Sequence, residues 1–205
     1  MFSLRKPSHT DLKDFLWKQQ DLPFTYAEVG ATRTEIPAGY TRGRQRVQLG
    51  TGRACYLDAK RCLAEWKMFP RGFVELVWPC PLETGRVVAT LFQAPGFWTL
   101  NPCRIVYTFD EPVEAEGRAM DRFGFAYGTV GSHLACGEEK FSVEYHHDDE
   151  SVWYEVDCFS KADHWLSKVA YPYLRLQQHR FRRLSALAMQ QSVQEVERQS
   201  AAVAV

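Results

Sequence analysis

The sequence predicts an α+β protein in which a curved antiparallel sheet grips a long C-terminal helix. Three observations predict this class: an early segment of helical periodicity, six short β-branched and aromatic segments after it, and a long helical segment at the end. Helices before and after a run of antiparallel strands collect on one face of the sheet. A curved sheet around one helix leaves a concave space, which is the expected ligand site.

The length and composition indicate one globular domain with short extensions. Of the 205 residues, 45% are hydrophobic and 24% are charged, which excludes a disordered chain. We expect an N-terminal arm at 1–22, a single domain at 23–196 and a flexible tail at 197–205. The 25 Lys and Arg balance 25 Asp and Glu, so no net charge attracts nucleic acid, and we expect no nucleic-acid partner.

The sequence contains no signal for secretion, membrane insertion or metal binding. No apolar stretch follows the first basic residues, and no run approaches the roughly 20 apolar residues that span a bilayer. The six cysteines contain no C-x-x-C pair, which favours reduced thiols. We therefore expect a cytoplasmic protein with no metal and no cofactor.

Helical periodicity appears at the start, in the middle and at the end of the chain. Ser8 begins a short helix that ends before Pro23, and a second helix is predicted over 56–68. A box-like start at 160–163 predicts a helix through 169, which Pro172 interrupts. A longer helix then runs from Pro172 to about Val196. The apolar residues of this region form two adjoining stripes: Leu166, Val169, Tyr173, Leu176 and Leu187 in one, and Leu174, Phe181, Leu184 and Ala188 in the other.

The segments between the helices are predicted strands because they are short, rich in β-branched and aromatic residues, and separated by turns. They are 46–49, 73–78, 86–93, 104–109, 122–129, 139–146 and 152–159. In the strand at 122–129, Phe123, Phe125 and Tyr127 share one face, and small residues share the other. That small face could receive the long helix closely, or it could form the floor of a pocket.

The central segments resemble a known family. They read RFGFAYGTVGSH from Arg122 to His133 and GEEKF from Gly137 to Phe141, and they resemble the block typical of the domain of unknown function 1990 family, also called uncharacterised protein family 0548. The likeness covers about residues 23–189. It departs from the family at Val130, where Leu is common, and in lacking a Pro after His133. The resemblance brings no settled activity, but it implies a helix-grip fold of the START-like or Bet v 1-like kind, in which many members hold apolar small molecules.

Four residues around this block are candidates for acid and base chemistry. Tyr127, His133, Glu138 and Glu139 lie within a short stretch. A His beside a carboxylate can share a proton near neutral pH, and a Tyr hydroxyl can polarise a carbonyl. We name His133, Glu139 and Tyr127 as candidate catalytic residues. The alternative is structural: Glu139 pairs with Arg33 or Arg104 and holds the loop in place.

The candidate ligand-binding residues combine charge with aromatic surface. A guanidinium binds a carboxylate or phosphate through two parallel hydrogen bonds, although it could equally pair with a protein glutamate. Large aromatic side chains around one cavity suit a flat apolar ligand, although most such side chains lie in the core. The set is Arg33, Trp66, Arg104, Tyr107, Phe125 and Glu138.

Two charged segments have surface interpretations. The C-terminal helix is basic through Arg175, Arg182 and Arg183, which could contact a membrane surface or form a solvated face. The hairpin 146–150 holds metal-ligand residue types, but adjacent hairpin residues rarely converge on one ion, so we expect a solvated turn.

The sequence thus predicts a protein that binds an apolar or amphipathic small molecule between the sheet and the C-terminal helix. The alternative is an enzyme that performs hydrolysis or isomerisation in the same cavity with His133, Glu139 and Tyr127. The oligomeric state is left open.

Overall fold

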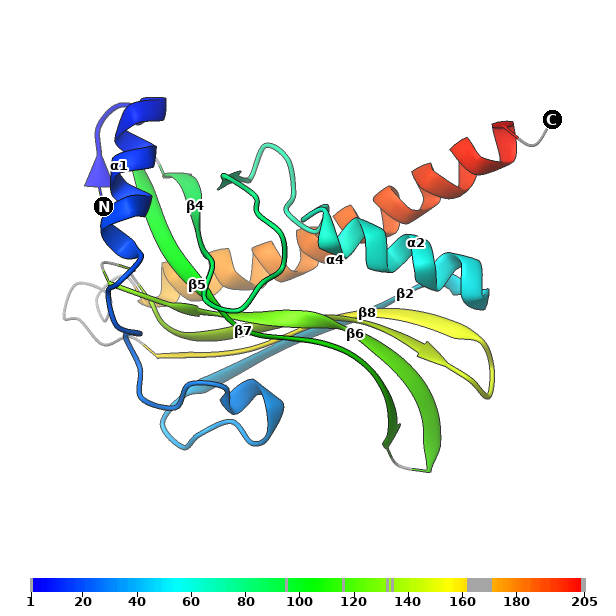
Figure 1. Cartoon of the computed structure of the whole chain (residues 1–205). Coiled ribbons are helices and arrows are strands. Elements are labelled where there is room, and N and C mark those ends of the chain that lie inside the picture. Colours follow the sequence, from blue (N-terminus) through cyan, green and yellow to red (C-terminus); the bar gives the residue numbers. More distant parts are fainter. Residues whose placement is uncertain are drawn as a thin grey trace.

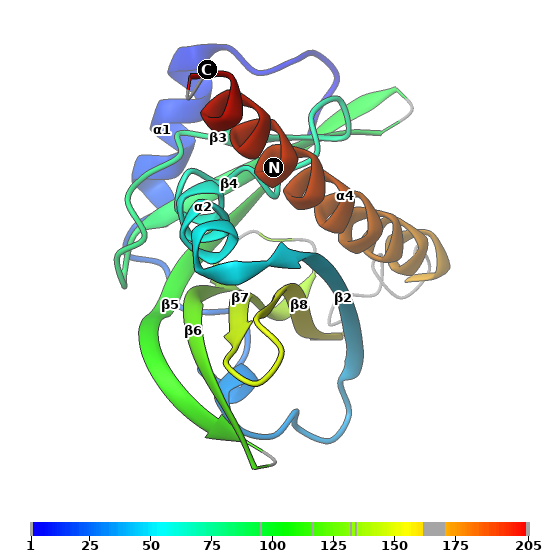
Figure 2. The same ribbon diagram turned by 90° about the vertical axis from the view of Figure 1, so that its right-hand side faces the viewer.

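The computed structural model describes residues 2–94, 96–115, 117–131, 133, 135–161 and 171–203. It contains an 8-stranded antiparallel sheet with the order β2-β8-β7-β6-β5-β4-β3, in which β1 pairs separately with β5. The sheet curls, and helices α2 and α4 lie over its concave face (Figures 1 and 2). The predicted fold class, a curved antiparallel sheet gripping a long C-terminal helix, is confirmed.

The elements follow the predicted order. The helices of the described residues are α1 (His9–Gln19), the 3-10 helix η1 (Ala31–Arg33), α2 (Gly52–Ala64) and α4 (Tyr171–Val203). The strands are β1 (Phe2–Ser3), β2 (Thr41–Thr51), β3 (Val74–Val77), β4 (Val87–Ala94), β5 (Phe97–Ala115), β6 (Arg118–Thr129), β7 (Cys136–His146) and β8 (Ser151–Lys161). The helix expected over 160–169 lies outside the described residues from 162 onward.

Helix α1 packs against the β4–β5 end of the sheet. Ser8 and Asp11 form a capping box at its start, which satisfies free backbone N–H groups. Its buried face places Phe15 against a cluster that includes Leu91 and Leu100. Arg104 donates to the backbone carbonyl of Leu22 at 2.8 Å and also to that of Gln20, so this side chain stabilises the end of the helical segment.

Helix α2 begins four residues earlier than predicted. Gly52 has a φ of +87°, and this conformation turns the chain from β2 directly into the helix. The helix buries Tyr56, Ala59 and Leu63 in the main core. Trp66 has a φ of 60°, a left-handed conformation that ends the helical segment before the predicted Met68.

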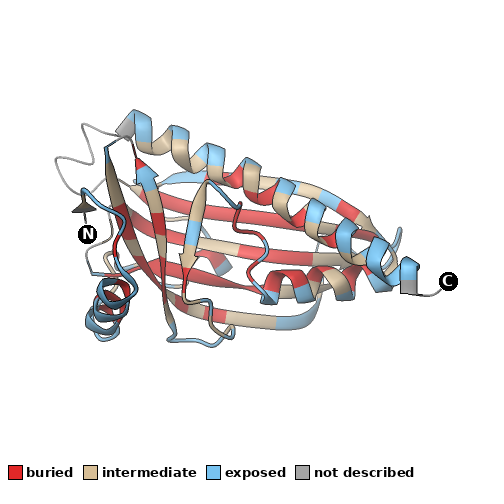
Figure 3. Cartoon of the chain, turned by 90° about the horizontal axis from the view of Figure 1, so that it is seen from above, coloured by how far each residue is buried: buried red, intermediate tan, exposed pale blue. Residues whose placement is uncertain are grey.

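Helix α4 differs from the prediction in length and in orientation. It continues to Val203 because the residues after Val196 are mostly good helix formers. One predicted stripe is wrong, since Tyr173, Leu176 and Leu187 are exposed. The buried face instead follows the residues Arg182, Ser185, Ala186, Met189 and Val193, which lie on one side of the helix at intervals of three or four positions. Figure 3 shows buried segments recurring along the helix.

Strand β5 is far longer than the predicted 104–109. Pro102 interrupts the strand pattern, but it costs no ladder hydrogen bond to β4. Its carbonyl accepts from the Val130 N–H on the opposite side, where β6 has ended at Thr129. Its nitrogen therefore faces a position without a ladder partner, which is where a strand tolerates proline.

The small face of β6 packs against neighbouring protein groups on the convex side of the sheet rather than against α4. A Cβ at Gly128 would lie 1.9 Å from the hydroxyl oxygen of Tyr26, and a Cβ at Gly124 would lie 2.7 Å from the Phe109 ring. The segment around Tyr26 thus packs on the convex face of the sheet. Phe125 and Tyr127 point the opposite way, into the main core on the concave side.

The helices of the described residues include no segment of sufficient length and apolar character to span a bilayer.

Candidate functional site

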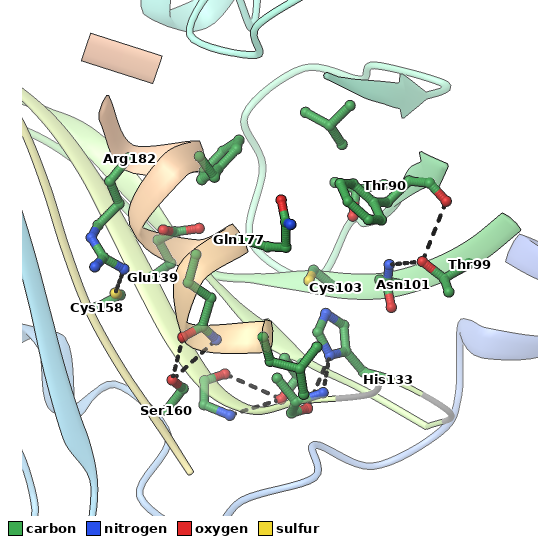
Figure 4. A pocket seen from close by; sticks show the side chains of 18 of the residues that line it. Thr90, Thr99, Asn101, Cys103, His133, Glu139, Cys158, Ser160, Gln177 and Arg182 are labelled. Carbon is green, nitrogen blue, oxygen red and sulfur yellow. Dashed lines mark hydrogen bonds between the residues drawn. The ribbon is translucent and has the colours of Figure 1, made fainter. Parts of the chain in front are cut away.

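A cavity of about 660 Å³ lies between the first half of α4 and the concave face of the sheet. Figure 4 shows it from close by. Its apolar lining comes from Phe69, Phe73, Val74, Phe92, Ala94, Phe97, Cys103, Ala135, Leu174 and Phe181. Polar side chains interrupt this lining at a few places: Thr90, Thr99, Asn101, Tyr127, Thr129, His133, Glu139, Ser160, Gln177, Gln178 and Arg182. A volume of this size suits a small organic molecule.

The sheet register places Glu139 on the floor of the cavity. Glu139 of β7 lies between Tyr127 of β6 and Cys158 of β8. Side chains alternate along a strand, so the neighbouring Glu138 points to the convex face. The Tyr127 hydroxyl donates a hydrogen bond of 2.8 Å to the Glu139 carboxylate.

The surroundings of Glu139 favour its neutral form. Burial raises the pKa of the Glu139 carboxyl to about 7, against the opposing effects of the Tyr127 hydrogen bond and the positive charge of Arg182. The carboxyl borders the cavity rather than bulk water, which explains a strong loss of hydration for a half-buried side chain. Glu139 can therefore take up or release a proton near neutral pH.

Arg182 of α4 points into the protein, contrary to the prediction of a surface arginine. Its side chain is buried, and its Nη1 donates to the Cys158 Sγ at 3.6 Å. The guanidinium lies against Gly43 of β2, where a Cβ would be 2.6 Å from its carbon. Arg182 therefore cannot serve a membrane surface, whereas the neighbouring Arg183 is exposed.

Two glutamines of α4 also line the cavity. Gln178 exchanges hydrogen bonds with Ser160 and accepts one of 3.1 Å from Arg175. The Oε1 atom of Gln177 is buried and has no hydrogen-bond partner among the residues that the structure describes. Figure 4 shows the Gln177 side chain in the cavity beside α4.

His133 lies apart from Glu139 in the cavity (Figure 4). Its Nδ1 accepts a hydrogen bond of 2.9 Å from the Ala135 N–H. Burial lowers the pKa of the His133 imidazole to about 4, so the ring is neutral at physiological pH. The hydrogen bonds of the described residues do not join His133 to Glu139, and the two share no proton directly.

Glu138 holds a loop on the convex face. Its carboxylate accepts hydrogen bonds from the Tyr26 hydroxyl at 2.8 Å, the Gly30 N–H at 2.7 Å and the Thr32 N–H at 3.0 Å. The Thr32 hydroxyl donates to the same carboxylate. The structural alternative therefore describes Glu138 rather than Glu139, and its partners are hydroxyl and backbone groups instead of arginines.

The remaining predicted ligand residues do not line the cavity. Arg33 lies over the Tyr107 ring, 4.1 Å from its centroid, on the convex face where Tyr107 bonds Thr32. Arg104 secures the end of the α1 segment. Trp66 packs edge-on against Phe125 with centroids 4.8 Å apart, inside the core. Of the predicted set, Tyr127, His133 and Glu139 line the cavity; Glu138 also borders it, but its carboxylate is bonded on the convex face.

The hairpin 146–150 is a solvated turn only in part. His146 is buried, and its Nε2 lies 2.9 Å from an Arg46 guanidinium nitrogen. Asp148, Asp149 and Glu150 are exposed. Across the part of the chain that the structure describes, the metal-ligating side chains form no group of three or more.

Four cavity residues were not predicted from the sequence: Ser160, Gln177, Gln178 and Arg182. A signal for Arg182 was present, since positions 182, 185, 186, 189 and 193 share one helical face that also carries small and apolar residues. The spacing of Arg175 and Arg182 along the helix instead favoured a basic face on the protein surface. No signal marked Gln177.

Comparison with known proteins places the chain in a family. The model named Domain of unknown function (DUF1990) matches residues 25–188. The chain belongs to the DUF1990 family. A UPF0548 protein of Dictyostelium discoideum is 32% identical over 198 residues, covering 88% of this chain and 90% of that protein. A UPF0548 protein of Arabidopsis thaliana is 36% identical over 151 residues, covering 74% and 72% respectively.

The comparison with solved structures gives matches of low similarity. A START superfamily protein from Mycobacterium smegmatis superposes with a TM-score of 0.43 and 13% identity, covering 77% of this chain and 99% of that chain. A likeness at this level carries no ligand or activity to DUF1990 proteins.

Proposed function

We propose that this DUF1990 protein binds an apolar or amphipathic small molecule in the cavity between α4 and the sheet. The observation that carries the proposal is a 660 Å³ cavity whose aromatic and aliphatic lining is interrupted by polar side chains, among them Glu139, Gln177 and Arg182. Known small-molecule sites combine an apolar wall with a small number of placed polar groups in this way.

The unpartnered amide oxygen of Gln177 supports the same proposal. A buried polar atom without a partner costs about 1–3 kcal/mol, and Gln177 carries such an atom at the cavity wall. A ligand that donates a hydrogen bond to Gln177 would remove this cost on binding.

The uncharged fluorescent probe N-phenyl-1-naphthylamine tests cavity binding directly. Its fluorescence should rise on saturable binding to the wild-type protein. The variant Cys103→Phe places an aromatic ring in the cavity and should abolish the rise. Leu57→Phe makes a comparable substitution on α2, where Leu57 is 53% exposed, and should bind the probe normally. Equal binding by both variants would refute the cavity as the site.

The second candidate function is acid–base catalysis in the same cavity. It is favoured by one observation: the Glu139 carboxyl, with a pKa raised to about 7, accepts the Tyr127 hydroxyl at 2.8 Å beside the cavity. A carboxyl with this pKa can act as a general base or acid at neutral pH. In this arrangement His133 would contact a substrate at another place in the cavity.

Hydrolysis of p-nitrophenyl butyrate examines this second function. Saturable turnover that Glu139→Gln abolishes, at an unchanged melting temperature relative to wild type at pH 6, would support it. Turnover that survives in Glu139→Gln would assign the hydrolysis to other groups and exclude Glu139 as its base.

A further inference from the structure

Arg182 is a buried cation for which the described residues provide no ion pair. Its side chain is 5% exposed, and it forms no salt bridge with the residues that the structure describes. Its single hydrogen bond within the described chain goes to a thiol, the Cys158 Sγ, which is a weak acceptor. A guanidinium carries five N–H donors, and burying its charge without an anion is costly.

The fold holds this guanidinium at the cavity wall. Gly43 of β2 pairs with Cys158 of β8, and both face α4. A Cβ at Gly43 would lie 2.6 Å from the guanidinium carbon and from its Nη1, so the absent side chain makes the space that the Arg182 head occupies. Arg182 lines the cavity from this position (Figure 4).

The apolar lining and the unpaired cation together define a ligand chemistry. Resting on the proposed cavity function, we propose that the ligand is an amphipathic monocarboxylate whose carboxylate binds the Arg182 guanidinium and whose apolar part lies along the aromatic lining. The guanidinium fork matches a carboxylate with two parallel hydrogen bonds. An uncharged apolar ligand would leave the cation unpaired.

Glu139 makes this recognition dependent on pH. The side chains that interact electrostatically with Glu139 are Tyr127 of β6, Cys158 and Tyr154 of β8, Cys103 of β5 and Arg182 of α4. An anionic ligand at Arg182 repels an ionised Glu139 and therefore favours its protonated form. Binding should take up a proton, and the affinity should fall as the pH rises through about 7, the pKa of Glu139.

Displacement of bound N-phenyl-1-naphthylamine by decanoate and by 1-decanol tests the proposal. Wild-type protein at pH 6.5 should bind decanoate more tightly than 1-decanol. Arg182→Met keeps an unbranched side chain but removes the charge. It should lower the affinity for decanoate by about tenfold or more and leave the affinity for 1-decanol unchanged. Arg183→Met removes the neighbouring exposed charge and should change neither.

Gly43→Ala provides a second variant that keeps Arg182. Its methyl group displaces the flexible end of Arg182 rather than backbone, so the fold should persist while decanoate affinity falls. Equal displacement by decanoate and 1-decanol in all proteins would overturn the carboxylate proposal and leave cavity binding intact. Failure of the uncharged probe to bind wild type would instead refute the proposed function.

Discussion

Glu138 and Glu139 are adjacent in sequence, yet their substitutions should have opposite effects. The Glu138 carboxylate accepts from Tyr26 and Gly30 on one oxygen and from Thr32 on the other. In Glu138→Gln the amide NH₂ must face donors whichever way it turns. We expect the free energy of unfolding to fall by about 3 kcal/mol and Tm to fall by roughly 10 °C, as measured by urea and thermal unfolding at pH 7. An unchanged Tm would contradict this anchoring role.

Glu139→Gln should stabilise the protein at alkaline pH. The folded-state pKa of Glu139 is raised to about 7, so the folded protein binds this proton more tightly than the unfolded chain. The stability that the carboxyl contributes is therefore full below its unfolded pKa of 4.5 and is lost as the pH rises through 7. At pH 8 the ionised carboxyl costs about 3 kcal/mol, at about 1.4 kcal/mol per pKa unit.

Urea unfolding of wild type and Glu139→Gln between pH 5 and pH 8 measures this effect. The advantage of the glutamine variant should grow from pH 5 to about pH 7 and level off toward pH 8. A difference that stays constant with pH would show that Glu139 titrates normally in the folded protein.

The sequence identified this pair of glutamates as functional candidates but could not assign their faces. Alternation along a strand separates the two side chains, but it does not say which one faces the concave side. That assignment depends on Gly128 and Tyr26, whose close approach marks the convex face and is visible only in three dimensions. For the same reason Arg33, Arg104 and Tyr107 were grouped with a cavity that lies on the other side of the sheet.

At the level of elements, the rotation of α4 about its axis determines which side chains support the core. Met189 is fully buried in the main core, whereas Leu187 is 48% exposed. Met189→Ala should lower the free energy of unfolding by about 2–5 kcal/mol, the range for deleting a large buried side chain. Leu187→Ala on the same helix should cost less than about 0.5 kcal/mol. Urea unfolding of both variants measures the difference, and equal losses would mean that α4 is rotated.

The predicted elements correspond to the observed ones because period and turn residues are local signals. The strands 86–93, 122–129, 139–146 and 152–159 differ from β4, β6, β7 and β8 by a few residues at their ends. Features that depend on distant partners were missed. Strand β5 passes through Pro102 because its neighbour β6 has already ended, and β1 exists through its pairing with Thr99 and Trp98. Neither fact is local.

At the level of the molecule, the curl of the sheet explains why one end has a core and the other a cavity. Toward the C-terminal half of α4, helix α2 lies beside it on the sheet (Figure 3). There Tyr56 and Leu63 of α2 fill the concave face together with Met189 of α4. Toward the first half of α4, the apolar residues of β4 and β5 line a space instead of packing together. The cavity therefore follows from the placement of α2 along only part of the sheet.

A side chain that fills this cavity should abolish ligand binding and raise the stability of the ligand-free protein. The atoms that line a cavity lack the van der Waals contacts that a packed interior would give them on the open side. Cys103→Phe adds an aromatic ring at a position that is 3% exposed and borders the cavity. We expect the ligand-free variant to be more stable by about 1 kcal/mol, because the ring buries apolar area without displacing packed atoms. Leu57→Phe, on the exposed side of α2, should leave stability within about 0.5 kcal/mol of wild type. Urea unfolding without ligand, beside the probe titration, separates the outcomes. A gain in stability together with lost binding means that selection has kept this space open for a ligand.

A large loss of stability in Cys103→Phe would mean that the space is already filled by side chains in solution.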